Sequence, residues 1–130
     1  MNSVNLRFVS SVGRKLNQMN NDFDRQVLNN YFCFNYKCWK CGQNHQDCLH
    51  HILKRVSNSP FNAAPLNNWN CHLNDPAIHT KETQTKYLQM TFDFLINEGY
   101  KPTKKDLMFL ENYQQYYDLE KLKKAGIEFL

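Results

Sequence analysis

A chain of 130 residues with a net charge of +4 suits one domain and leaves little room for a second. No stretch approaches the roughly 18 apolar residues of a membrane span, and the first residues lack the apolar region of a signal peptide. We therefore expect an intracellular, cytoplasmic protein with no membrane contact, whose positive charge suits a polyanionic partner.

The first predicted element is an N-terminal helix over residues 12–31. Apolar residues recur there at steps of three and four, as one face of a helix requires: Val12, Leu16, Met19, Phe23, Val27, Leu28 and Tyr31. The segment YFCFNYKCWKCGQNH that follows alternates aromatic and polar residues, which predicts a strand that enters a tight turn. Cys33, among these aromatic residues, is expected to be a small core residue.

Cysteines with metal-ligand spacing occupy this turn. Cys38 and Cys41 are separated by two residues and followed by Gly42, so a tight turn can direct both sulfurs at one ion. The cysteine count, five in a reducing compartment, favours a metal site over a disulfide framework. We predict a structural zinc ion with four thiolate ligands: Cys38, Cys41, Cys48 and Cys71. His45 is an alternative ligand, and a hairpin with two unligated cysteines is the simpler alternative to a zinc site.

The middle segment, residues 48–79, is rich in Asn, Ser and Pro and predicts short strands and loops. Its most unusual feature is the adjacent pair His50 and His51. Neighbouring residues on a strand point to opposite faces, so the two imidazoles cannot both bind one ion through the same face. One can bind a divalent ion while the other accepts a proton from water, because an imidazole titrates near neutral pH.

Helices are predicted over the rest of the chain. Thr80 is suited to cap a helix that ends at Gly99, and a second helix begins at Thr103, where Thr103 and Asp106 have nearly the spacing of a capping box. The second helix has an apolar stripe, expected to be core, of Leu107, Leu110, Tyr113 and Tyr117. A short basic helix over 119–125 follows. The sequence therefore predicts an α+β fold, a short antiparallel hairpin with one helix framed by N- and C-terminal helices.

The order of motifs in the middle segment resembles that of the HNH endonucleases of the ββα-metal fold. The matching elements are HHI-x-x-R, then N-A-A-P-L, then C-H and a further H, and the likeness is greatest to small phage-type members with a Cys-x-x-Cys ahead of the histidine pair. The resemblance covers about residues 38–79. It implies one HNH nuclease domain over 1–130, with a helical extension at about 1–32, a zinc and HNH core at about 33–80, and C-terminal helices at about 80–130.

The resemblance also implies roles for individual residues. His51 matches the general base that activates water, and Asn62 matches the asparagine that braces the loop and orients the base. Arg55 is expected near the cleaved phosphate, with Lys54 beside it as a further DNA contact. The catalytic ion, which would be Mg²⁺, Mn²⁺, Ni²⁺ or Zn²⁺, matches three ligand positions: His50, His72 and His79. Asp75 is the alternative to His79.

The function implied is metal-dependent hydrolysis of DNA phosphodiester bonds to give a 5′-phosphate and a 3′-hydroxyl, in a protein of phage or mobile-element origin that acts in the host-cell cytoplasm. A double-strand cut by a single active site would favour a homodimer. Lysines of the C-terminal helices are expected to contact the DNA backbone: Lys101, Lys104, Lys105, Lys123 and Lys124. The alternative function is a zinc-stabilised DNA-binding module without catalysis, and a third is a structural protein with a zinc knot.

Overall fold

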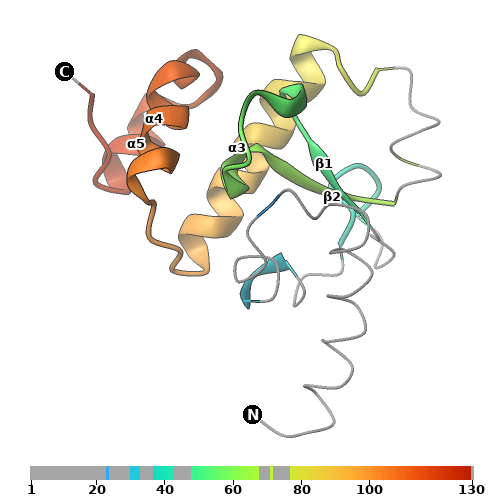
Figure 1. Ribbon diagram of the computed structural model, residues 1–130, viewed down its shortest axis with the longest axis horizontal. Helices are drawn as coiled ribbons and strands as arrows, with labels where there is room; N and C mark the ends of the chain where they lie inside the picture. Colours follow the sequence, from blue (N-terminus) through green and yellow to red (C-terminus); the bar gives the residue numbers. More distant parts are fainter. Residues whose placement is uncertain are drawn as a thin grey trace, which may run out of the picture.

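The computed structural model describes residues 23, 30–32, 37–42, 48–67, 71 and 77–129, and for residue 48 the backbone alone. In this part of the chain the fold is mixed α+β, with one antiparallel strand pair and three α-helices. The elements are β1 (Cys48–His51), β2 (Ala63–Leu66), α3 (Lys81–Asn97), α4 (Lys104–Asn112) and α5 (Leu119–Lys124). Figure 1 shows α3 in the middle, between the strands on one side and the α4–α5 pair on the other.

The two strands form a hairpin whose register determines which side chains face each other. His50 pairs with Ala64 and His51 pairs with Ala63. The connecting loop contains two 3₁₀ turns, η2 (Lys54–Val56) and η3 (Pro60–Asn62). The short strands and loops expected in the middle segment are thus confirmed over residues 48–67, the longest continuous part of it that the structure describes. All four residues of β2 are buried, because the turn at residues 38–42 and α3 pack against it.

Local capping signals define the two longer helices. The Thr80 side chain accepts a hydrogen bond from the Thr83 amide at the start of α3, and Gly99 follows its end with a φ of 84°. At α4 the Thr103 side chain accepts from the Asp106 amide while the Asp106 carboxylate accepts from the Thr103 amide, which is a capping box. These helix starts and the basic helix α5 were predicted correctly.

A buried carboxylate connects the hairpin loop to α4. Asp106 is 2% exposed and accepts hydrogen bonds from the Ser59 hydroxyl at 2.6 Å, from the Tyr100 hydroxyl and from the Thr103 amide. Three donors and the positive end of α4 compensate for the loss of water around this group. The loop after β1 and the start of α4 are therefore held together.

The core lies between β2, η3 and α3. Its largest buried side chains include Phe32, Phe61, Phe92, Leu49, Leu66, Leu88 and Leu95. One expectation for α4 was wrong: Leu107 is 37% exposed, because the inward face of this helix is formed by Phe109 and Leu110. Tyr117, expected on the same helix, lies beyond its end yet is buried.

Several predictions fall outside the described residues. They include most of the N-terminal helix at 12–31, the strand expected just before the cysteine turn, and the residues Cys33, His45, His72 and Asp75. Among the helices that the structure describes, none has the length and apolar character needed to cross a membrane.

Candidate functional site

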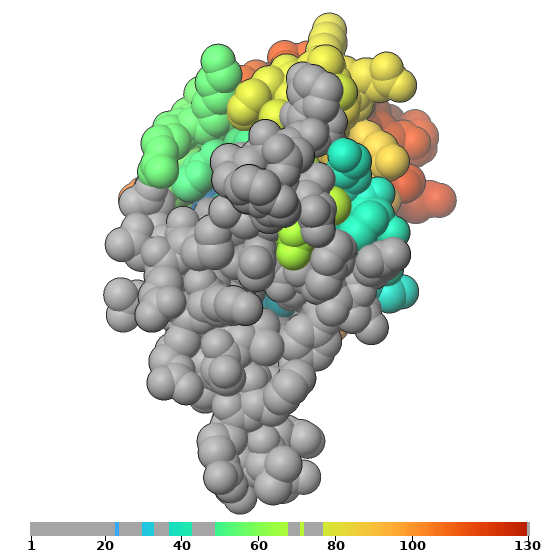
Figure 2. All heavy atoms as spheres, turned by 90° about the vertical axis from the view of Figure 1, so that its right-hand side faces the viewer, coloured from blue at the N-terminus to red at the C-terminus, as the bar shows by residue number. Residues whose placement is uncertain are grey.

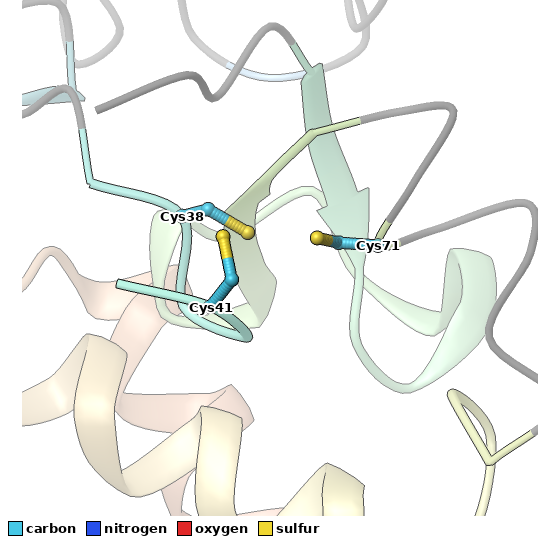
Figure 3. A group of neighbouring side chains, drawn as sticks. All are labelled: Cys38, Cys41 and Cys71. Carbon is cyan, nitrogen blue, oxygen red and sulfur yellow. The ribbon is translucent and has the colours of Figure 1, made fainter. Parts of the chain in front are cut away.

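Three cysteine sulfurs lie together beside β2. The Sγ atoms of Cys38, Cys41 and Cys71 are all within 4.8 Å of one another, and Figure 3 shows the three side chains pointing toward a common centre. Cys38 and Cys71 are buried, while Cys41 is exposed. The turn between the first two is closed by a hydrogen bond from the Gly42 amide to the Cys38 carbonyl at 2.9 Å, with Gly42 at a φ of 74°. This group could hold a metal ion, compatible with structural zinc.

The electrostatics of the cluster favour a thiolate at one position. Burial opposes ionisation of Cys38, but backbone amides directed at its sulfur bring its pKa below the usual 9.0. The pKa of Cys71 is raised to about 12 by burial and by its hydrogen bond to Cys38. Amide donors aimed at sulfur are an arrangement that stabilises a metal-bound thiolate, because the thiolate is the form that binds metals.

The cysteine turn is attached directly to the hairpin and to α3. The Trp39 amide donates to the Pro65 carbonyl at 2.8 Å, and the Trp39 indole N–H donates to the Thr91 hydroxyl at 2.7 Å. Thr91 in turn donates to the Ala63 carbonyl at 2.7 Å. Since Ala63 pairs with His51, two buried polar links join the cysteine turn to the strand opposite the histidines.

The predicted fourth ligand lies outside this description. Residue 48 begins β1, but the structure does not describe its side chain, and His45 is not among the described residues. The structure thus brings together three of the four predicted thiols, and both alternatives for the fourth remain predictions.

His50 and His51 occupy different environments although they are adjacent on β1. His50 is 5% exposed, with its Nε2 shielded from solvent, and its ring centroid lies 5.3 Å from that of His79, which is exposed. Two imidazoles whose nitrogens lie about 2.1 Å from a shared ion have centroids roughly 4.5–5.5 Å apart. His50 and His79 therefore have a separation that suits two ligands of one ion. Both histidines precede α3, which begins two residues after His79.

His51 is held by a stacking contact and a hydrogen bond. Its ring stacks on Phe23 with centroids 4.2 Å apart, and its Nε2 lies 3.0 Å from the amide oxygen of Asn58. Because an amide oxygen can only accept, Nε2 donates, so in the neutral ring the proton-accepting lone pair is on Nδ1. Burial lowers the pKa of His51 below 6.5, more than the Asn58 hydrogen bond raises it. The ring is consequently neutral at pH 7, which is the form a general base requires.

Asn62 fastens the loop that follows β1. Its side chain is fully buried; the amide oxygen accepts from the Leu53 amide at 2.8 Å, and the amide nitrogen donates to the carbonyls of Lys54 at 3.1 Å and Ser57 at 2.9 Å. These contacts match the bracing expected of this residue. Among the described residues, the side chain that hydrogen-bonds to His51 is Asn58, which sequence reasoning did not select.

Lys54 and Arg55 lie on the surface of this braced loop. Both side chains are exposed. Figure 2 shows the loop after β1 in green and the start of α3 in yellow on the same face of the molecule. An exposed pair of cations beside the two histidines can meet a phosphate without burial of charge.

The backbone of Lys54 is strained. Its φ is 57°, the one positive value among non-glycine residues that the structure describes. This conformation costs a residue with a Cβ roughly 1–2 kcal/mol, and the hydrogen bond from Asn62 to its carbonyl helps to hold it.

We expect Lys54→Gly to be more stable than Lys54→Ala by about 1 kcal/mol, because only glycine relieves the left-handed strain. Both variants lose the same cation, so a difference in stability between them reports the backbone at this position. Urea unfolding measures this difference. Equal stability of the two variants would show that the strain is absent in solution.

The residues that sequence reasoning missed are Asn58 and Phe23 as contacts of His51. Asn58 offered a weak signal, since it is a polar side chain in the same short loop. Phe23 belongs to the apolar stripe of the predicted N-terminal helix, and its contact with His51, which is far away in the sequence, leaves no pattern there.

Comparisons with family models, with curated proteins and with solved structures found no match to this chain.

Proposed function

We propose that this chain is a metal-dependent endonuclease of the HNH type, which hydrolyses DNA phosphodiester bonds with His51 as general base. The observation that carries the proposal is the division of labour on β1. The ring centroids of His50 and His79 lie 5.3 Å apart, a separation that suits two ligands of one ion, whereas His51 is held at Nε2 by Asn58. A further support is the order of β1, β2 and α3, which is the order of elements in a ββα-metal core.

The proposed chemistry is an in-line displacement at phosphorus. Water loses a proton to Nδ1 of His51 and its oxygen attacks the phosphorus, while the bond from phosphorus to the 3′ oxygen breaks with its electron pair going to that oxygen. The 3′ oxygen takes a proton from solvent water and becomes the 3′-hydroxyl. Because attack and departure occur on opposite sides of the phosphorus, base and ion have to approach from opposite sides. Adjacent strand residues project from opposite faces, so one imidazole can bind the ion while its neighbour does not bind it and serves as the base.

The residues that would hold the catalytic ion are His50 and His79, with His72 as the third predicted ligand. A bound divalent ion would supply a Lewis acid for the charge that develops on the phosphoryl group and the leaving oxygen. Arg55 and Lys54 would hold the phosphate oxygens from the surface of the loop. We infer that the ion at the cysteine cluster is structural Zn²⁺, bound by Cys38, Cys41, Cys71 and either Cys48 or His45.

A nicking assay with added metal tests the proposal. Protein freed of weakly bound ions should convert supercoiled plasmid to open circles only after addition of Mg²⁺, Mn²⁺ or Ni²⁺. His79→Ala should need at least about tenfold more ion for half-maximal nicking, because a ligand is lost, whereas Lys81→Ala, an exposed change two residues away, should not.

A second candidate function is DNA binding without catalysis. It is favoured by the cysteine cluster, whose proposed zinc would stabilise the fold without the histidines, and by the net charge of +4. If the wild-type protein shifts DNA on a gel but nicks it with none of the three ions, this function replaces the nuclease.

A further inference from the structure

A cleft of about 930 Å³ opens beside the candidate base, between the loop at 57–60 and the turn at 99–106. Asp106 connects the two sides, since it accepts hydrogen bonds from Ser59 on one and Tyr100 on the other. The cleft is therefore bounded by segments that are hydrogen-bonded to each other, so it is formed in advance of binding. Its volume is at the upper end of the roughly 300–1,000 Å³ typical of ligand pockets.

The cleft shares part of its lining with the surroundings of His51. Asn58 lines it and also contacts Nε2 of His51, and Phe23 lines it and also stacks on the His51 ring. One layer of side chains thus separates the interior of the cleft from the candidate base. A ligand in the cleft would therefore lie one side chain away from the imidazole of His51, on the side of Asn58 and Phe23.

The lining combines the groups that recognise an unpaired nucleotide. Tyr31 and Tyr100 meet edge to face, with centroids 5.3 Å apart, and both remain partly exposed. Hydroxyl and amide groups of the lining can bond to base edges and sugar, and the exposed Lys101 and Lys105 can meet phosphates. The Asp106 carboxylate also lines the cleft, but its oxygens already accept three hydrogen bonds.

We propose that this cleft binds roughly one or two unstacked nucleotides of the strand that is cut, so that single-stranded or branched DNA is preferred over continuous duplex. The inference rests on the proposed nuclease function. Aromatic faces can stack only on bases that have left the duplex, and leaving costs least where the strand is already unpaired. Of the five lysines expected to contact DNA, Lys101 and Lys105 border the cleft, whereas Lys123 and Lys124 lie on α5.

Fluorescence anisotropy tests the cleft proposal by measuring DNA affinity without added catalytic ion. The probe is a labelled oligonucleotide of about 12 nucleotides, either single-stranded or annealed to its complement. We expect the single strand to bind about tenfold more tightly, the order of one stacked base. Lys101→Ala/Lys105→Ala should lower the slope of log affinity against log salt by about 1.4, near 0.7 for each lost phosphate contact. Lys81→Ala/Lys86→Ala removes the same charge from exposed positions of α3 outside the cleft and should leave the slope nearly unchanged.

A second variant tests stacking itself. Tyr31→Leu keeps an apolar side chain against Tyr100 but removes the aromatic face, and it should lower single-strand affinity by at least about fivefold. Equal affinity for duplex and single strand, or equal slope changes in the two lysine pairs, would overturn the cleft proposal. These binding results do not depend on cleavage. If the protein nicks DNA but does not prefer the single strand, only the cleft proposal is rejected. If it shows the expected binding but never nicks DNA, the nuclease proposal is rejected.

Discussion

Replacing His51 with glutamine should lower the rate of metal-dependent nicking by about 10²- to 10⁴-fold, the usual contribution of a general base. Glutamine nearly preserves the volume beside Phe23 and can still bond to Asn58, but its amide cannot accept a proton at neutral pH. DNA affinity should stay close to that of the wild type, because the phosphate contacts proposed for Lys54 and Arg55 are retained. Single-turnover nicking and anisotropy together measure this separation of rate from binding.

A graded comparison makes the result specific. Asn58→Ala leaves the imidazole in place but removes its hydrogen-bond partner, so the rate should fall by less, up to about 100-fold. Gln115→Ala removes an exposed amide from η5 (Gln114–Tyr116) and should have no effect. If His51→Gln nicks at the wild-type rate while its melting temperature is unchanged, His51 is not the base and the proposed chemistry fails.

The parts of the fold that sequence reasoning predicted are those decided by neighbouring residues. Thr80 and the Thr103–Asp106 box begin helices because capping involves side chains only three residues apart. The same local logic located the turn at Cys38, Cys41 and Gly42. The buried faces were harder, because Leu107 is apolar and correctly spaced but faces solvent once α4 is oriented by Asp106 and Ser59.

The candidate site was predictable in its residue types and not in its contacts. The pair His50 and His51 indicated two roles, because a strand separates adjacent side chains. Asn58 contacts His51 because Asn62 holds the loop that carries Asn58. Phe23, which covers the His51 ring, comes from a segment far away in the sequence. Likewise, no spacing rule could tell that the cleft beside His51 would be completed by residues 99–106.

Removal of the Zn²⁺ proposed for the cysteine cluster is expected to lower the melting temperature by roughly 10 °C or more, since structural zinc contributes directly to folding free energy. The effect should extend to the hairpin, because Trp39 bonds to Pro65 and, through Thr91, to Ala63 opposite His51. Nicking should therefore be lost with strong chelators even when Mg²⁺ is restored, and should return with Zn²⁺. Cys71→Ser should reproduce the loss, whereas Cys33→Ser should retain the metal.

Cobalt substitution distinguishes the two candidates for the fourth ligand. Co²⁺ bound by thiolates has intense sulfur-to-metal charge-transfer absorption, so each thiolate lost weakens the band. If Cys48 is the fourth ligand, Cys48→Ser weakens this absorption and lowers the melting temperature, and His45→Ala changes neither. If His45 is the ligand, Cys48→Ser keeps the full charge-transfer absorption, because the three thiols of Cys38, Cys41 and Cys71 still bind the ion. In that case His45→Ala weakens metal binding. One outcome would contradict a structural role for the cluster. If metal analysis shows that the wild-type protein contains no bound ion, and this protein is fully stable and nicks DNA normally, then the three thiols within 4.8 Å of one another are held together by packing alone.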